Sequence, residues 1–472
     1  MTDVDAVVVG SGPNGLVAAV RLAQAGLRVV VLEAAERVGG GLRTEELTLP
    51  GFRHDVCATV HALAQAAVAF RELGLERDGL TYAHPPVPLG HPLDALPAVI
   101  LDRDVDTTAR GLGRDGRAWR TLVASMAAAG PEVVDGLLSP MQVPPRHPLR
   151  LAAFGARGIW PATWVNAAAF REPRARALFA GVSAHAILPL TSPATSGYGL
   201  MLASLAHSVG WPVAVGGSQA IADALVRRLR SLGGEVVTGT DVRRLSALPS
   251  HRVALLDITP RQFLRIADAE LSGRYRRALE RYRYGPGVFK LDWALDGPVP
   301  WGDERLAAAG TVHLGGRAEE IVAGERTVSR GGHPERPYVL FVQASVADPS
   351  RAPAGKQTGW AYCHVPNGST VDMTGAIEAQ LERFAPGFRE RVLARHAMGP
   401  AALEAHNANE VGGDISGGAA DLRQFVARPV LGLDPWSTPL PDVYLCSAST
   451  PPGGGVHGMG GWHAAAAALR RM

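Results

Sequence analysis

The N-terminal part of the chain alternates apolar runs with glycines in an order that predicts a strand, a helix and a second strand. Residues 4–9 are rich in β-branched side chains, and residues 16–25 are rich in Ala and Leu, as helices are. Gly26 is expected to end the helix, and residues 27–32 form a second apolar run that leads to Glu33. This order predicts two parallel strands joined by a helix.

A glycine-rich turn lies between the first strand and the helix. Gly10, Gly12 and Gly15 have the G-x-G-x-x-G spacing, which provides a tight turn, close approach of backbone to a pyrophosphate, and close packing of helix on strand. Glu33 is placed to accept hydrogen bonds from an adenosine ribose. A second match at residues 111–116 follows a charged stretch instead of a strand, so we expect a surface loop there. The candidate cofactor-binding residues of the first match are Gly10, Ser11, Gly12, Pro13, Asn14, Gly15 and Glu33.

A second glycine cluster follows Glu33, on the loop that leaves the second strand. Its glycines and arginines suit the phosphates and ribityl chain of a dinucleotide, which makes candidates of Arg37, Gly40, Gly41, Leu42 and Arg43. Together with the first cluster, the spacing E-x-x-x-R-x-G-G-x-x-R-T at residues 33–44 resembles the FAD-binding start of the flavin amine oxidase and phytoene dehydrogenase superfamily. The resemblance implies that Glu33 holds the AMP ribose and that the loop lies along FAD.

The C-terminal end repeats the order of strand, glycine loop and helix. Residues 443–446 form a short apolar strand, a Pro- and Gly-rich loop follows, and an Ala-rich run leads to Arg471. The loop resembles the C-terminal flavin motif of carotenoid desaturase-like proteins, in the branch typified by pyridine nucleotide-disulphide oxidoreductase domain-containing protein 2, although Ser447 stands where relatives commonly have Gly. The resemblance implies FAD contacts from Gly454, Gly455, Val456 and His457. A helix N-terminus there can stabilise negative charge on a reduced flavin.

Patterns in the middle of the chain predict further strands of the first domain and, in addition, a second domain. A helix is expected at 219–232, and strands are expected at 235–238 and 253–260. The resemblance implies that the backbone of Val242 contacts the adenine. Strand patterns between residues 289 and 365, with helices at 119–138 and 149–190, predict a second sheet and its cover. The predicted fold class is α/β, with a discontinuous Rossmann-like FAD-binding domain at 1–75, 213–265 and 405–472, and a substrate-binding domain of mixed or antiparallel sheet and helices at 76–212 and 266–404.

The composition limits the cellular compartment and the binding partners that we expect for the protein. The chain of 472 residues has 47 basic and 44 acidic side chains, and its basic residues do not cluster as a nucleic-acid interface would require. The three cysteines lie far apart and form no metal or redox motif, and no secretory signal precedes residue 4, so we expect a cytoplasmic protein. Residues 177–222 contain no Asp, Glu, Lys or Arg, but their prolines oppose a membrane span, which leaves a buried lining or peripheral membrane contact.

One dinucleotide site predicts tightly bound FAD and hydride transfer between flavin N5 and a substrate carbon, in desaturation, saturation or isomerisation. The uncharged stretch and the resemblance together favour a hydrophobic substrate, an isoprenoid, polyene or unsaturated lipid. O₂, a quinone and NAD(P) all remain as electron acceptors. Two alternatives stay open: an amine or amino-acid oxidase using O₂, and a flavoprotein that acts only as an interaction partner.

Three residues are candidates for catalysis. His457 belongs to the glycine loop that the resemblance places beside the flavin, and histidine titrates near neutral pH. His61 follows the N-terminal FAD segment. Lys356 is considered because amine oxidases of the superfamily use a lysine beside the flavin. Each has a structural alternative: a loop histidine, a polar loop residue and a turn lysine.

Overall fold

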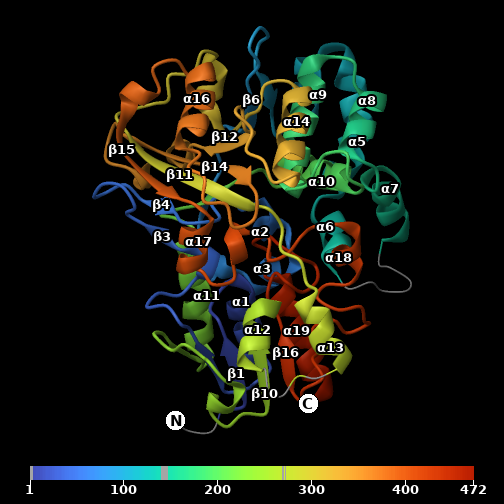
Figure 1. Ribbon diagram of the computed structural model, residues 1–472, viewed down its shortest axis with the longest axis vertical. Helices are drawn as coiled ribbons and strands as arrows, with labels where there is room; N and C mark the ends of the chain where they lie inside the picture. The colour runs from blue at the N-terminus through green and yellow to red at the C-terminus, as the bar shows by residue number, and fades with distance from the viewer. Residues whose placement is uncertain (1–3, 140–146, 268–270, 272) are drawn as a thin grey trace.

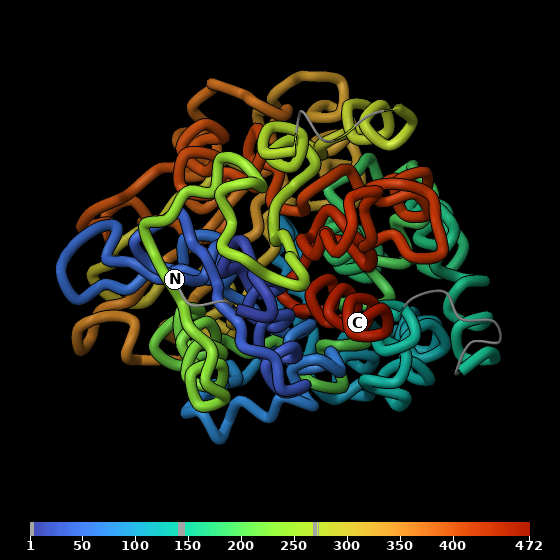
Figure 2. The backbone as a smooth tube through the Cα atoms, turned by 90° about the horizontal axis from the view of Figure 1, so that it is seen from below, coloured from blue at the N-terminus to red at the C-terminus, as the bar shows by residue number. Residues whose placement is uncertain are grey.

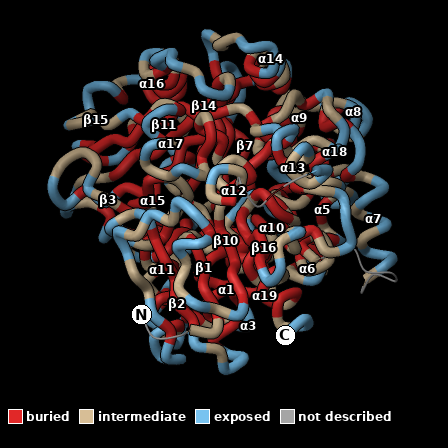
Figure 3. Tube along the Cα trace, turned by 60° about the horizontal axis from the view of Figure 1, so that its bottom comes forward, coloured by how far each residue is buried: buried red, intermediate tan, exposed pale blue. Residues whose placement is uncertain are grey.

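Two sheets, one parallel and one mixed, form the two ends of the molecule in the computed structural model, which describes residues 4–139, 147–267, 271 and 273–472 (Figure 1). The buried strands of both sheets and the exposed outer helices are seen in Figure 3. The predicted α/β class is confirmed. The division into domains at fixed residue numbers stays a prediction.

The five-stranded sheet is entirely parallel and has the order β16-β10-β1-β2-β9. Helices α1, α11 and α19 pack on one face of it, and α12 and α13 pack on the other. Figure 2 shows the C-terminal helix α19, in red, beside the N-terminal elements in blue. The bounds are β1 Ala6–Val9, β2 Val29–Leu32, β9 Glu235–Val237, β10 Val253–Leu256, β16 Val443–Leu445, α1 Pro13–Gln24, α11 Gln219–Ser231, α12 Pro260–Ile266, α13 Gly273–Glu280 and α19 Met459–Arg471.

The seven-stranded sheet has the order β15-β11-β14-β13-β12-β6-β7, and all of its pairs are antiparallel except β12 with β6. Helix α16 (Thr374–Phe384) covers one face through a core that includes Trp293 and Phe341. The sequence patterns predicted the four central strands and missed the rest. The bounds are β6 Val87–His91, β7 Val99–Leu101, β11 Gly287–Leu295, β12 Ala309–Leu314, β13 Val339–Val342, β14 Gln357–Val365 and β15 Val392–Met398.

Helices between the two sheets cover the other face of the seven-stranded sheet (Figure 1). The uncharged stretch at 177–222 is divided between several elements, because Pro189 and Pro193 interrupt it. Within the described ranges, no helix combines the length and the apolar character that crossing a bilayer requires. The bounds are α2 Ala62–Ala66, α3 Val68–Leu73, α4 Val105–Gly111, α5 Gly116–Ala129, α6 Pro131–Leu137, α7 Pro148–Gly158, α8 Ala162–Ala169, α9 Pro173–Ser183, α10 Thr195–Ser208, α14 Ala318–Ser329, α17 Pro400–His406 and α18 Leu422–Val426.

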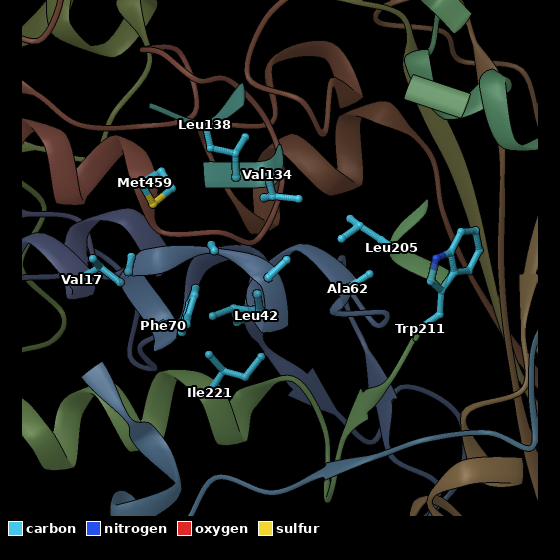
Figure 4. Close-up of a cluster of buried hydrophobic side chains, with 14 of the residues drawn as sticks. Val17, Leu42, Ala62, Phe70, Val134, Leu138, Leu205, Trp211, Ile221 and Met459 are labelled. Atoms are coloured by element: carbon cyan, nitrogen blue, oxygen red, sulfur yellow. The ribbon is translucent and has the colours of Figure 1, made fainter. Parts of the chain in front are cut away.

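A core cluster joins these helices to the parallel sheet. Leu42, Phe70 and Ile221 belong to it, together with Leu205 and Trp211 from the α10 region (Figure 4). The second glycine match at 111–116 lies at the junction of α4 and α5, where Asp115 is buried and accepts hydrogen bonds from the backbone of residues 171 and 172. The expected surface loop is therefore a packed helix junction.

Candidate cofactor and substrate site

One cavity of about 1390 Å³ extends from the carboxyl ends of the parallel strands to the seven-stranded sheet. Most binding cavities for small molecules have roughly 300–1,000 Å³. The larger volume leaves room for a dinucleotide and a second molecule.

The glycine fingerprint has the geometry that its sequence predicts. Gly10 has a φ of 95°, which favours glycine, and it turns the chain from β1 into α1. A Cβ added at Gly15 would lie 2.2 Å from the carbonyl oxygen of Gly10, so only glycine permits this packing of helix on strand. Gly12 faces the cavity and borders Asp257, whose Oδ2 would lie 2.6 Å from an added Cβ. The backbone at the start of α1 is thus bare toward the cavity.

Glu33 is held at the end of β2 by three hydrogen bonds. Its Oε2 accepts from the backbone N–H of Ser11 at 2.8 Å and from the Ser11 hydroxyl at 2.5 Å, and its Oε1 accepts from the N–H of Ala35 at 2.9 Å. A carboxylate has about four lone-pair sites, so acceptor capacity remains on Oε1 for one ribose hydroxyl. Val242 lines the same part of the cavity.

The other predicted cofactor residues divide into those that reach the cavity and those that support it. Gly40, Gly41 and Arg43 line the cavity, and an added Cβ at Gly40 would lie 3.1 Å from Cα of Gly12. Arg37 instead donates to the carbonyl of Thr44 at 3.3 Å, and Leu42 is fully buried in the core. Of the C-terminal loop, Gly454, Gly455 and Val456 line the cavity.

The three predicted catalytic residues are not among the described residues that line the cavity. His457 is buried, and its Nδ1 accepts from the N–H of Met459 at 3.0 Å, which ties the ring to the start of α19. His61 is buried with its Nε2 2.7 Å from the hydroxyl of Ser218. Lys356 is partly exposed and forms an ion pair with Asp296. His457 and His61 follow predicted FAD segments and Lys356 is suggested by the resemblance, but the side-chain contacts of all three lie outside the cavity lining.

Several cavity residues were missed by the sequence reasoning. Asp257 and Glu410 are buried carboxyl groups, and burial is the main cause that raises the pKa of each to about 7. On the seven-stranded sheet, Thr311 faces the cavity, and His185 faces it from the turn after α9. Nothing local in the sequence signals these positions, because each depends on contacts between distant segments.

The arrangement fits FAD on structural grounds. A bare helix N-terminus, close-approaching glycines and an acidic group at the end of β2 suit a pyrophosphate and a ribose. The C-terminal loop and the loop at 40–43 line the continuation of the cavity, and their residues would hold an isoalloxazine. The fold and site therefore define a dinucleotide-binding protein whose cavity has room for a second molecule beside the dinucleotide.

Comparisons with known proteins identify similar sequences and structures. A model of the NAD(P)-binding Rossmann-like domain matches residues 8–72. The chain is 25% identical over 566 residues to pyridine nucleotide-disulfide oxidoreductase domain-containing protein 2 of Mus musculus, covering 99% of this chain and 94% of that protein. It is 24% identical over 501 residues to the neurosporene-forming phytoene desaturase of Rhodobacter capsulatus, covering 96% and 91%.

A solved structure of putrescine oxidase with bound putrescine has a TM-score of 0.65 at 18% identity and 99% coverage of both chains, so the two proteins share a fold. The sequence relatives confirm the predicted resemblance, and together with this shared fold they support FAD as the cofactor. The chain is an FAD-dependent oxidoreductase that is similar to a phytoene desaturase in sequence and to an amine oxidase in fold.

Proposed function

We propose that this oxidoreductase transfers hydride between flavin N5 and a carbon of a hydrophobic substrate, an isoprenoid, polyene or unsaturated lipid. The observation that carries the proposal is the apolar wall of the cavity beyond the cofactor-binding residues. Leu63, Phe154, Met201, Leu340 and Trp360 contribute to it. Bound FAD supplies the hydride chemistry.

The chain's own residues bind and orient the substrate. Leu340 and Val342 of β13 and Trp360 and Tyr362 of β14 present a flat apolar surface on one side of the cavity. Helices α7 and α10 provide the opposing apolar side chains. Such a wall excludes water from the reacting atoms, which protects a hydride from loss to solvent.

The similarity to a phytoene desaturase over most of the chain supports desaturation, saturation or isomerisation of a carbon–carbon bond. The fold shared with putrescine oxidase keeps amine oxidation by O₂ as the second candidate. Carboxyl groups such as Glu410 and Asp414 do line the cavity, but the side chains that β13 and β14 present to it are uncharged, and this extended apolar surface favours the first candidate.

We also infer that the protein meets a membrane at the mouth of the cavity. Large apolar side chains are exposed there on and beside α7, α8 and α18, and several of them also line the cavity. This mouth rim consists of Leu149, Ile159, Trp160, Trp164, Leu422, Phe425 and Val426.

The test is an anaerobic titration of the FAD-loaded protein, followed by flavin absorbance. We expect phytoene to shift or bleach the flavin spectrum and putrescine to leave it unchanged. Gly12→Val is the control, because a side chain there meets Asp257 and should leave protein with little flavin. Adding O₂, a quinone or NAD(P)⁺ to reduced protein then identifies the acceptor.

The opposite results decide against the proposal. Bleaching by putrescine alone would establish the amine oxidase alternative. A stable flavin spectrum with phytoene, putrescine and NADPH, together with a stable complex with another protein, would establish the flavoprotein as an interaction partner only.

A further inference from the structure

Three adjacent strands form a platform on the cavity side of the seven-stranded sheet. The strand register places Trp360, Val342 and Thr311 in one row across β14, β13 and β12. A second row consists of Tyr362, Leu340 and His313. The platform is aromatic on β14, aliphatic on β13 and polar on β12. Because neighbouring strands lie ~4.8 Å apart, its aromatic and polar edges are about 10 Å apart.

The aromatic edge of the platform is the one joined to the cofactor side. Trp360 donates from Nε1 to the backbone carbonyl of Asp55 at 2.9 Å, and Asp55 also accepts from the hydroxyl of Thr44, which ends the second glycine cluster. Cys57, two residues further on, lines the cavity. The polar edge on β12 therefore lies on the side of the platform away from this contact.

A histidine pair stands at the polar edge. Nε2 of His185, from the turn after α9, lies 3.0 Å from Nε2 of His313 on β12. His185 lines the cavity, whereas His313 is fully buried behind it. An added Cβ at Gly181 of α9 would lie 3.0 Å from Nδ1 of His313, so the helix backbone closes over that atom. Within the described part of the chain, no hydrogen-bond partner reaches it.

The buried Nδ1 of His313 decides how the pair holds its protons. Two neutral rings that meet through their Nε2 atoms share one proton between them. If His185 donated it, His313 would carry its own proton on the enclosed Nδ1, as a buried N–H without a partner, which proteins rarely tolerate. The favoured arrangement has His313 donating to His185. The proton of His185 is then on Nδ1, the ring nitrogen outside the pair, and His185 is the member of the pair that lines the cavity.

Both rings are neutral at neutral pH. Burial lowers the pKa of His185 to about 3, and burial, His185 and His91 together hold the pKa of His313 well below its usual value. Beside them, Thr311 is nearly fully buried, lines the cavity, and its hydroxyl lacks a partner among the described residues. Two uncharged donors thus face one end of an otherwise apolar wall.

We propose that His185 and Thr311, with His313 setting the tautomer of His185, form a subsite that binds a hydroxyl or carbonyl oxygen at one end of the substrate. The inference rests on the proposed function, because it assigns the polar end of the same hydrophobic molecule. A protonated amine is disfavoured there, since His185 presents a donor. The subsite limits the substrate class to an apolar chain or polyene with an uncharged oxygen at one end. That oxygen lies about 10 Å, the width of the platform, from the end of the molecule that reacts.

Retinol and anhydroretinol test the subsite, because they differ by the hydroxyl group and are otherwise similar polyenes. Their binding to the FAD-loaded protein is measured through quenching of protein fluorescence, to which Trp211 and Trp360 on the wall contribute. We expect the wild type to bind retinol about tenfold more tightly, the effect of one good hydrogen bond. His185→Phe should remove that preference and leave the affinity for anhydroretinol within about threefold. Thr311→Val should reduce the preference by a smaller factor.

His185→Gln keeps an N–H donor of similar length and should retain part of the preference. His251→Phe, beside the parallel sheet and outside the cavity, is the matched control and should behave as the wild type. Flavin content and Tm confirm that each variant is folded.

Equal affinities of the wild type for the two ligands would overturn the subsite and leave the proposed hydrophobic substrate standing. A preference for retinol that remains in both His185→Phe and Thr311→Val would also overturn the subsite and leave the proposed hydrophobic substrate standing. Binding of neither polyene by the wild type would instead contradict the proposed function itself, and the subsite with it.

Discussion

Asp257 brings a carboxyl group to the place where the glycine fingerprint meets the end of β10. Its Oδ2 accepts from the backbone N–H of Gly15 at 2.9 Å, and the residue lines the cavity. Burial and the charge of Glu33 raise the pKa of Asp257 to about 7. A pyrophosphate bound at the start of α1 would add further negative charge nearby. Only the protonated carboxyl can lie beside it without repulsion.

FAD retention should therefore depend on pH through Asp257. The protonated form persists below about pH 7, and deprotonation above this pH adds a negative charge beside the phosphates. We expect affinity for FAD to fall by up to about tenfold for each pH unit above the pKa. Asp257→Asn should retain FAD to higher pH. The measurement is the flavin absorbance that remains after dialysis at a series of pH values.

Asp223→Asn is the control, since Asp223 of α11 lies outside the cavity and contacts Gln219. It should leave the profile unchanged. If Asp257→Asn loses FAD over the same pH range as the wild type, the carboxyl is not the titrating group.

At the level of single residues, the sequence predicts backbone roles better than side-chain roles. Gly10 and Gly15 act as their spacing predicts, because the turn between a strand and a helix is local. Asp257 and the pair of His185 and His313 could not be found this way, since each acts through a residue more than a hundred positions away. His457 was chosen for its place in a glycine loop, and its hydrogen bond to Met459 directs it elsewhere.

Helices α1 and α19 pack closely because glycines of α19 permit it. A Cβ added at Gly461 would lie 1.8 Å from the backbone oxygen of Asn14, and one added at Gly460 would lie 2.7 Å from the carbonyl oxygen of Cys446. Arg21 of α1 stacks over Trp462 at 3.8 Å and donates to its carbonyl at 2.8 Å. The sequence pattern predicts that the glycines before Trp462 belong to the flavin-binding loop. In the structure, Gly460 and Gly461 lie in α19 and permit its close packing on α1.

Gly461→Ala should push α1 and α19 apart and shift the start of α1, where a pyrophosphate would bind. Overpacking of this kind typically costs about 1–3 kcal/mol. We expect a lower Tm in thermal unfolding and a lower flavin content. Gly375→Ala in α16 is the matched control, because no atom lies within 4 Å of the added Cβ and alanine favours a helix. It should keep or raise Tm. An unchanged Tm for Gly461→Ala would show that the helices separate without cost.

The whole molecule is assembled from segments that alternate between its two ends. The strands of the parallel sheet come from the beginning, the middle and the end of the chain, and the sequence patterns predicted all five of them. Strand register and the position of the cavity mouth could not be predicted, because both depend on tertiary packing. Residues of α7 and α18 line the cavity together, although most strands of the seven-stranded sheet lie between these two helices in the sequence. Figure 1 shows both helices on the same side of the molecule.

Basic side chains lie on the helices that carry the mouth rim. Arg150 on α7 and Arg423 on α18 are exposed, as are Arg274 and Arg277 on the nearby helix α13. An apolar rim with arginines around it suits the surface of an anionic bilayer, since apolar side chains enter the headgroup boundary and arginines contact lipid phosphates. A water-insoluble substrate could then pass from the bilayer to the cavity without crossing water.

Vesicle binding tests this orientation. We expect the FAD-loaded protein to sediment with vesicles of phosphatidylcholine and phosphatidylglycerol, and less with phosphatidylcholine alone. Phe425→Ser with Trp164→Ser should weaken binding about a hundredfold or more, because burying each aromatic side chain is worth about 1.5–3 kcal/mol. Leu393→Ser, at an exposed apolar position on β15, should have no effect. If the double variant binds vesicles as well as the wild type does, the membrane contact lies elsewhere on the protein. If the wild type does not bind vesicles, the membrane proposal is wrong, and the mouth rim is only an entrance for a substrate that arrives by another route.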